Sequence, residues 1–250
     1  MFRLALVGIG SGNPAHLTLQ AIRTLEGADV ILLPRKGADK ADLADLRRMI
    51  ATEILTDAPP VVEFDLPVRD EATPDYQSRV KDWHDEIAGI WAETLRGALP
   101  DGGTAALMVW GDPSLYDSTL RIAERLPGLG VPVQVAVVPG ITSLQMLTAA
   151  HAIPLNTVGG PVQITTGRRL RDHGWPDGVD TVAVMLDGQC SFQSLDPTGL
   201  HIWWGAYVGM DQQVLIEGPL PEVTTRIVET RAKARADHGW IMDIYLIRRV

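Results

Sequence analysis

The 250-residue sequence contains a single cysteine, Cys190, and this scarcity excludes two common kinds of site. One cysteine cannot form an intrachain disulfide framework, and it cannot build a zinc site that needs several thiolates. Six histidines are present, but their positions show none of the short spacings typical of metal ligands. We therefore expect no bound metal ion and a protein of the cytoplasm.

The sequence also lacks long apolar runs and an excess of positive charge. No segment approaches the roughly 18 consecutive apolar residues needed to span a bilayer, so we expect no membrane association. The apolar start at residues 1–7 is interrupted by Gly8 and Gly10, which favours a core strand over a signal peptide. The 22 Lys and Arg residues are outnumbered by 31 Asp and Glu residues, giving a net charge of −9. This balance argues against nucleic acid as a partner.

Three glycine-containing loops follow apolar segments that are suited to buried strands. The first loop is residues 8–14 (Gly-Ile-Gly-Ser-Gly-Asn-Pro), the second is residues 110–116 (Trp-Gly-Asp-Pro-Ser-Leu-Tyr), and the third is residues 139–143 (Pro-Gly-Ile-Thr-Ser). In an open α/β sheet the carboxyl ends of parallel strands share one edge, where ligands bind. The three loops together predict such a binding edge.

The spacing of apolar residues predicts an α/β fold with two domains. In the first half, strands alternate with helices, which is typical of a largely parallel sheet. In the second half, strands joined by short turns are more numerous, which indicates a mixed sheet. We expect an N-terminal domain at residues 1–143 and a C-terminal domain at residues 144–250. The predicted strands are 4–7, 30–33, 61–66, 104–109, 133–138, 162–165, 181–186, 201–208, 213–216 and 240–247, and the main predicted helices are 17–25, 43–54, 76–95, 143–151 and 221–236.

The first loop does not fit a dinucleotide-binding fingerprint. Asn13 stands where the pattern G-x-G-x-x-G requires its third glycine, and Pro14 follows it. The second predicted strand ends without the acidic residue that would hold a ribose. A nicotinamide or flavin enzyme is therefore the weakest interpretation. A tight turn without a ligand, and simple helix capping by Thr142 and Ser143, remain alternatives for the individual loops.

Taken together, the loops resemble the signatures of the tetrapyrrole methylases, which are enzymes that use S-adenosylmethionine. The resemblance covers essentially the whole chain, because residues 153–155 extend the third loop and residues 212–220 resemble a C-terminal motif of the family. It implies two α/β domains with the cofactor in the cleft between them, a homodimer, and S-adenosylhomocysteine as a product. It also implies a tetrapyrrole of the precorrin type as the substrate.

The resemblance transfers the cofactor contacts of the family to the loops and to the ends of two strands in the second domain. Two positions depart from the family pattern: Ser11 stands where many relatives have proline, and Trp110 replaces a common glycine. Pro34 occupies the place of an acidic base in some relatives, so we assign no catalytic residue. The expected cofactor-binding residues are Gly10, Ser11, Trp110, Gly111, Asp112, Leu115, Tyr116, Thr142, Ser143, Met185, Ala206, Tyr207 and Val208.

Basic residues are the candidates for binding a tetrapyrrole, because its periphery carries carboxylates. A solvated surface role is the alternative for each of them. The candidates are Arg35, Lys36, Arg69, Arg168, Arg169 and Arg171. Five further polar residues could assist the loss of an acyl group, and the sequence gives no way to choose among them. These are Glu63, Asp65, Asp70, Tyr116 and Asp117.

Within the family, residues 111–119 most resemble members that methylate C-1 of a corrin precursor of cobalamin and release its acetyl group as acetate. A tetrapyrrole methylase that acts at another ring position, or a protein methylase such as diphthine synthase, is the alternative on the same scaffold. A protein that binds a tetrapyrrole or nucleotide without chemistry is the alternative of a different class, because no catalytic residue is identified.

Overall fold

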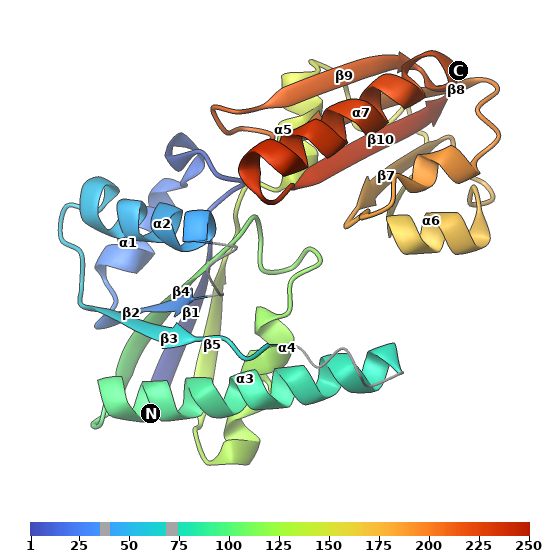
Figure 1. The fold of residues 1–250 in the computed structure, drawn as a ribbon. Helices are drawn as coiled ribbons and strands as arrows, with labels where there is room; N and C mark the ends of the chain where they lie inside the picture. Colours follow the sequence, from blue (N-terminus) through green and yellow to red (C-terminus); the bar gives the residue numbers. More distant parts are fainter. Residues whose placement is uncertain (36–40, 69–74) are drawn as a thin grey trace. The chain divides into compact units, whose positions relative to one another are not determined.

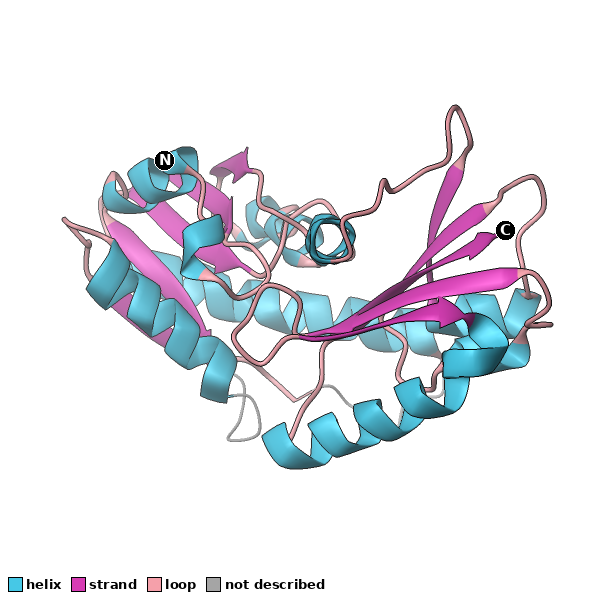
Figure 2. Cartoon of the chain, turned by 90° about the horizontal axis from the view of Figure 1, so that it is seen from above, coloured by secondary structure: helices cyan, strands magenta, loops and turns pink. Residues whose placement is uncertain are grey.

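A computed structural model of the chain describes residues 1–35, 41–68 and 75–250. They form two compact units (Figure 1; Figure 2). The first unit contains Met1–Gly10 and Pro14–Ile141, and the second contains Ser11–Asn13 and Thr142–Val250. Three residues of the first loop therefore pack with the second unit, although the chain on both sides of them belongs to the first.

The first unit is built on a five-stranded sheet with the order β3-β2-β4-β1-β5, in which every neighbouring pair is parallel. All the predicted strands of this half are confirmed, and the largely parallel sheet is confirmed with them. Because the strands are parallel, their carboxyl ends lie at one edge of the sheet. The strands are β1 (Phe2–Gly8), β2 (Val30–Arg35), β3 (Val61–Asp65), β4 (Gly103–Val109) and β5 (Val133–Val138).

Alternate residues of the strands face two separate apolar cores. Leu4 and Leu6 of β1 belong to a cluster with the buried stripe of α3, whereas Ala5 and Val7 belong to a cluster with α1 and the end of α2. Thr18 caps α1 by accepting a hydrogen bond from the Ala21 N–H. The helices are α1 (Leu19–Glu26), α2 (Ala41–Met49), which continues as the π-helix η3 (Ile50–Ile54), α3 (Tyr76–Ala98) and α4 (Thr119–Ala123).

The second unit is built on a mixed sheet with the order β6-β7-β10-β8-β9. The β6–β7 pair is parallel, and the other three pairs are antiparallel. The α/β fold with one parallel and one mixed sheet is therefore confirmed. The strands are β6 (Val162–Thr166), β7 (Thr181–Met185), β8 (Leu200–Ala206), β9 (Val214–Pro219) and β10 (Asp243–Arg249).

Helices cover both faces of this second sheet. Val182 and Val184 of β7 pack in a cluster with α6 and α7, while Ala183 and Met185 pack in a cluster with α5. The predicted helices α5 (Ser143–Ala150) and α7 (Leu220–His238) are confirmed. The short α6 (Gly167–His173) was not predicted, because Leu170 is its only large buried side chain and gives no helical periodicity. No helix within the described ranges is long and apolar enough to cross a membrane.

Candidate functional site

Three glycines bring the loops of the first unit into direct backbone contact at the carboxyl edge of the sheet. A Cβ atom added to Gly8 would lie 2.5 Å from the Gly140 nitrogen and 2.8 Å from the Gly111 oxygen. A Cβ atom added to Gly140 would lie only 2.0 Å from the Gly111 oxygen. Gly10 and Gly111 also exchange two backbone hydrogen bonds, at 3.3 and 2.8 Å. The expectation that the three loops share one edge is confirmed.

The Asp112 carboxylate holds the second and third loops together. Its Oδ1 accepts hydrogen bonds from the N–H (2.8 Å) and the hydroxyl of Ser114, and its Oδ2 accepts one from the Gly140 N–H at 2.9 Å. Burial raises the pKa of the Asp112 carboxyl, but these hydrogen bonds outweigh burial and leave the pKa below its usual value. Asp112 is therefore ionised at neutral pH, and its oxygens stabilise the shape of the loops.

The backbone around Gly111 is open on one side. Gly111 has a φ of +68°, and a Cβ atom added to it would meet none of the described residues within 4 Å. Tyr116, at the end of the same loop, has a φ of +51° and is 43% exposed. Left-handed backbone at a residue other than glycine is strained, and such strain is concentrated at functional sites. Trp110 and Leu115 in this loop are half-buried.

Four of the expected cofactor residues in the second unit lie around one apolar cluster. Val208, after β8, belongs to the cluster that contains Leu144 and Leu147 of α5, and Met185, at the end of β7, packs against this cluster. Thr142 and Ser143 begin this same helix. The Thr142 hydroxyl accepts a hydrogen bond from the Gln145 N–H, and the Gln145 side chain accepts one from the Thr142 N–H. The Thr142 side chain thus caps α5, which is the alternative that the sequence left open.

Ser11 is anchored in the second unit by its side chain. The buried Ser11 hydroxyl donates a hydrogen bond of 2.9 Å to the Val208 carbonyl. Gly12 follows with a φ of +121°, and a Cβ atom added there would lie 2.5 Å from the Met210 side chain. A serine at position 11 therefore makes a hydrogen bond that the proline of many relatives could not make.

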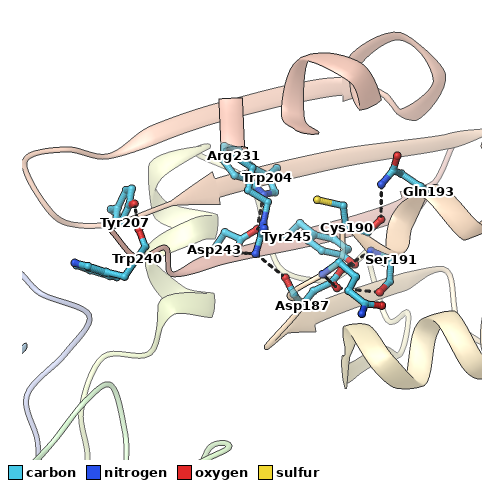
Figure 3. A network of polar contacts seen from close by, with 11 residues as sticks. Asp187, Cys190, Ser191, Gln193, Trp204, Tyr207, Arg231, Trp240, Asp243 and Tyr245 are labelled. Carbon is cyan, nitrogen blue, oxygen red and sulfur yellow. Dashed lines mark hydrogen bonds and ion pairs between the residues drawn. The ribbon is translucent and has the colours of Figure 1, made fainter. Parts of the chain in front are cut away.

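The side chain of Tyr207 is part of the core. Its hydroxyl donates to the Trp240 carbonyl at 2.5 Å and lies 3.2 Å from the Ala234 carbonyl (Figure 3). The Tyr207 N–H donates to the Met242 carbonyl at 2.9 Å. Ala206, the last residue of β8, is fully buried. The side chain of Tyr207 is thus engaged within the core, and a contact of this segment with the cofactor stays a prediction.

The structure divides the predicted substrate-binding cations between the two units. Arg35, at the exposed end of β2, forms ion pairs with Asp65 at 2.8 Å and Glu63 at 3.8 Å, so its charge is partly balanced. The three arginines of α6 are exposed and lie together at the end of β6. They are Arg168, Arg169 and Arg171. Lys36, Arg69 and Asp70 lie outside the described residues.

The carboxylates considered for acyl release are held by neighbouring groups. Glu63 accepts a hydrogen bond from Arg48 at 2.7 Å, and this bond keeps the pKa of Glu63 below its usual value. Asp117 accepts hydrogen bonds from the N–H and hydroxyl of Thr119, which fixes the turn that starts α4. These contacts are structural, and none of them identifies a catalytic acid or base.

Arg47 is a half-buried cation that sequence reasoning missed. Its Nε donates a hydrogen bond of 3.1 Å to the carbonyl of Met108 in β4, two residues before the second loop. Burial lowers the pKa of Arg47 to about 10, although the charge of Asp117 partly offsets this effect. The sequence did hold a signal for its partial burial. Arg47 stands four residues after Leu43 and three before Ile50, which places it on the apolar stripe of the predicted helix.

A buried polar network in the second unit also escaped prediction. Arg231 of α7 forms an ion pair of 2.9 Å with Asp243 of β10, and both side chains are almost fully buried. The indole N–H of Trp204 donates to the same carboxylate at 3.1 Å. Figure 3 shows this network beside Asp187 and Cys190. Its members come from β8, α7 and β10, at separations of 12 and 39 residues from Asp243, so no local motif indicates them.

Comparison with known proteins connects this arrangement to one family. The model of the "Tetrapyrrole (Corrin/Porphyrin) Methylases" matches residues 3–224. The chain is 51% identical to the precorrin-6A synthase [deacetylating] of Sinorhizobium sp over 251 aligned residues, which cover 100% of this chain and 96% of that protein. It is 29% identical to a precorrin-2 C(20)-methyltransferase of Sinorhizobium sp, over 68% of this chain and 69% of the relative.

Solved structures give the same result. The CobF structure from Corynebacterium diphtheriae matches with a TM-score of 0.84 and 39% identity, over 100% of this chain and 99% of that one. A uroporphyrin-III C-methyltransferase from Thermus thermophilus, complexed with S-adenosylhomocysteine, shares the fold with a TM-score of 0.59 and 21% identity, over 98% of this chain and 97% of that one. The expected family resemblance is thus confirmed, and the chain belongs to the tetrapyrrole (corrin/porphyrin) methylases.

Proposed function

We propose that this protein is an S-adenosylmethionine-dependent C-methyltransferase that acts as a precorrin-6A synthase (deacetylating) in aerobic cobalamin biosynthesis. The reaction methylates C-1 of precorrin-5 and releases the acetyl group as acetate. The observation that carries the proposal is the 51% identity to a precorrin-6A synthase [deacetylating] along the entire chain. The glycine contacts between the three loops support it, because they bring together the loops whose sequences resemble the signatures of the family.

The residues of each unit offer groups that fit S-adenosylmethionine. In the first unit, the open backbone at Gly111 permits the close approach of a ligand. In the second unit, the Ser143 and Leu144 N–H groups at the start of α5 lack intrahelical acceptors and favour an anionic group such as the cofactor's carboxylate. Met185 adds a polarisable apolar contact. We propose that the binding residues are Gly10, Trp110, Gly111, Asp112, Leu115 and Tyr116 of the first unit and Ser11, Thr142, Ser143, Met185, Ala206, Tyr207 and Val208 of the second.

The contribution of the protein to this chemistry is positioning. When bound, the cofactor supplies an electrophilic methyl group that a nucleophilic ring carbon accepts. The loops locked by Gly8, Gly111 and Gly140 form a rigid frame, and rigid alignment of two reactants can lower a barrier by about 7 kcal/mol or more. The Asp112 carboxylate is engaged with Ser114 and Gly140, so its role is to hold the second and third loops in register.

The alternatives on the same scaffold differ in the substrate. Another tetrapyrrole methylase would act at a different ring position, and a diphthine synthase-like enzyme would methylate a protein. The identity of 29% to a precorrin-2 C(20)-methyltransferase is much lower than the identity to the deacetylating enzyme, which favours precorrin-5 over precorrin-2. We also propose that the protein works as a homodimer in the cytoplasm. A single buried cysteine fits a reducing compartment, and sedimentation would test the dimer.

The decisive experiment is turnover of precorrin-5 with mass analysis of the product. The protein is incubated with S-adenosylmethionine and precorrin-5, and parallel reactions omit the cofactor or replace the substrate with precorrin-2. We expect a product that has gained a methyl group and lost its acetyl group, together with free acetate. A product that keeps its acetyl group, or faster methylation of precorrin-2, would contradict the proposal. Calorimetry with S-adenosylhomocysteine and NADPH should detect binding of the former alone.

A further inference from the structure

Leu186, directly after β7, is an apolar side chain held in an unfavourable position. It is 67% exposed to solvent, and its φ of +54° places a leucine in the left-handed region. Exposure forgoes the benefit of burying a large apolar group, and left-handed backbone at a γ-branched residue is strained. Such a conformation persists only where the surrounding structure fixes it, and it is characteristic of binding sites.

The carboxylate of Asp187 fixes the loop that follows Leu186. Asp187 is only 6% exposed, and each of its oxygens accepts two hydrogen bonds (Figure 3). Oδ1 accepts from the Gln189 N–H at 3.0 Å and the Ser191 hydroxyl at 2.9 Å. Oδ2 accepts from the Ser191 N–H at 2.5 Å and the Tyr245 hydroxyl at 2.6 Å. Burial raises the pKa of Tyr245 well above 10, so its hydroxyl keeps the proton that it donates.

Two further contacts hold Asp187 from other elements. Arg231 donates a hydrogen bond of 3.1 Å from Nη2 to the Asp187 carbonyl, while its ion pair with Asp243 fixes the guanidinium. On the other side, a Cβ atom added to Gly167 would lie 2.2 Å from Asp187 Cγ. The first residue of α6 therefore packs directly on this loop. The loop is over-determined by groups from β10, α6 and α7.

Leu186 lies beside the start of a helix that carries three exposed arginines, of which Arg171 is paired with Asp172 at 3.1 Å. Thr166 and Met185 are paired neighbours at the ends of β6 and β7, so α6 begins beside the segment that carries Leu186. The exposed arginines of α6 lie at this strand end, and Arg171 donates a hydrogen bond to the side chain of Gln189 in the same loop. An exposed apolar contact next to several guanidinium groups suits a ligand with an apolar ring and peripheral carboxylates.

We propose that Leu186 is a substrate-contacting residue that packs against the tetrapyrrole macrocycle, with the α6 arginines facing the carboxylates of that substrate. Asp187 is the positioning residue that holds Leu186 in place. The inference rests on the proposed function, and it names where in the second unit the methyl acceptor is bound. It is distinct from the cofactor assignment, because Met185 packs in the α5 cluster whereas Leu186 points its exposed surface to solvent.

The test replaces Leu186 without disturbing the fold. Leu186→Gly removes the side chain and relieves the left-handed strain, and Leu186→Asn offers a polar side chain that tolerates this backbone. We expect an unchanged or higher Tm, an affinity for S-adenosylhomocysteine within about twofold of the wild type, and a KM for precorrin-5 raised by about tenfold. Val158→Asn, at a fully exposed apolar residue of the second unit, is the control and should change none of the three.

A binding measurement keeps this inference separate from the proposed function. Uroporphyrin III is titrated into each protein, and the quenching of tryptophan fluorescence reports its binding. Weaker binding by both Leu186 variants supports the inference, whether or not the wild type turns over precorrin-5. Failure of the wild type to turn over precorrin-5 would contradict only the deacetylating assignment. Wild-type affinity and KM in both variants would overturn the contact with Leu186.

The positioning role of Asp187 is tested by a double-mutant cycle. Asp187→Asn replaces an acceptor oxygen by an amide that faces N–H and O–H donors, so the loop should relax. We expect the KM for precorrin-5 to rise by about tenfold in Asp187→Asn alone, and to rise no further when Asp187→Asn is added to Leu186→Gly. A purely structural role would lower the Tm in both backgrounds and leave the KM unaffected. Additive increases in KM would also overturn the assignment, because Asp187 would then act through another group.

Discussion

The backbone N–H of Gly140 donates a hydrogen bond of 2.9 Å to the carboxylate of Asp112, and this bond joins the second loop of the first unit to the third. Gly140 also packs against the carbonyl of Gly111, the residue that precedes Asp112. The acidic residue of the second loop is therefore as much a structural element as a candidate ligand contact. Its replacement should change the shape of the site before it changes any direct contact.

Asp112→Asn should weaken cofactor binding and lower stability. The amide keeps the size of the side chain but loses one acceptor oxygen, so a hydrogen bond from Gly140 or Ser114 is lost at a cost of about 1–3 kcal/mol. Calorimetric titration with S-adenosylhomocysteine and thermal unfolding measure the two effects. Asp101→Asn, at an exposed position before β4, is the control and should behave as the wild type. Wild-type affinity in Asp112→Asn would show that the second loop is misassigned.

The contribution of Asp112 to the free energy of unfolding should be lost at acid pH. The pKa of the Asp112 carboxyl is lowered in the folded protein. Its contribution to stability is therefore fully present above the pKa that this carboxyl has in the unfolded chain, about 3.9. The contribution is lost as the pH falls through the folded-state pKa, because the carboxyl then takes up a proton. The difference in stability between the wild type and Asp112→Asn should thus be largest near neutral pH and shrink below about pH 4. Urea unfolding at several pH values measures it, and a pH-independent difference would contradict this account.

Gly140→Ala should be among the most damaging single methyl additions in the first unit. The new Cβ would lie 2.0 Å from the Gly111 oxygen and 2.8 Å from the Gly8 carbonyl carbon, so backbone must move at a cost of about 3 kcal/mol or more. Gly97→Ala, inside α3 where an added Cβ meets nothing nearby, is the matched control. It should be neutral or stabilising by up to about 1 kcal/mol. Equal melting temperatures for the two variants would show that the loops do not need this contact.

Arg231→Met should destabilise the second unit strongly. The substitution removes the ion pair and leaves the buried Asp243 carboxylate with the hydrogen bond from the Trp204 indole N–H, and an uncompensated buried charge costs about 3–5 kcal/mol. Arg226→Met, on the exposed side of the same helix, should change stability by less than about 0.5 kcal/mol. Urea unfolding of both variants decides the matter. A small effect of Arg231→Met would mean that water replaces the ion pair.

Cys190 should be unreactive in the folded protein. Its side chain is buried, and burial raises the pKa of the thiol to about 11, so at pH 8 the reactive thiolate is scarcer than in a free cysteine by about two orders of magnitude. Labelling with a chromogenic disulfide should be slow in buffer and fast in urea. Rapid labelling under native conditions would contradict the packing around Cys190.

The sequence predicted those features that repeat along the chain. Apolar alternation located the strands, and the stripe of Ile87, Trp91 and Leu95 in α3 identified a helix whose side chains are buried as expected. The glycines of the loops pointed to a common edge because tight backbone contacts exclude side chains. By contrast, the seven-residue α6 carries too few apolar residues to produce a period.

The site was only partly predictable, because its contacts link distant segments. Asp187 binds Tyr245, and Arg231 binds Asp243, across separations that no local pattern encodes. Residue type alone also leaves open which use a side chain has. The Tyr207 hydroxyl bonds within the core and the Thr142 hydroxyl caps α5, and the expected cofactor contacts of both residues stay predictions.

The assignment of Ser11–Asn13 to the second unit has a consequence for biosynthesis of the chain. These residues are synthesised early. The Val208 carbonyl, which accepts the hydrogen bond from the Ser11 hydroxyl, is synthesised 197 residues later. All residues of the first unit are therefore synthesised before Val208. Until then Ser11–Asn13, within the glycine-containing first loop, lack the segment with which they pack in the folded protein. A gene split between the codons for 141 and 142 would yield a second fragment that lacks Ser11–Asn13, and a peptide carrying these residues would have to be supplied in trans.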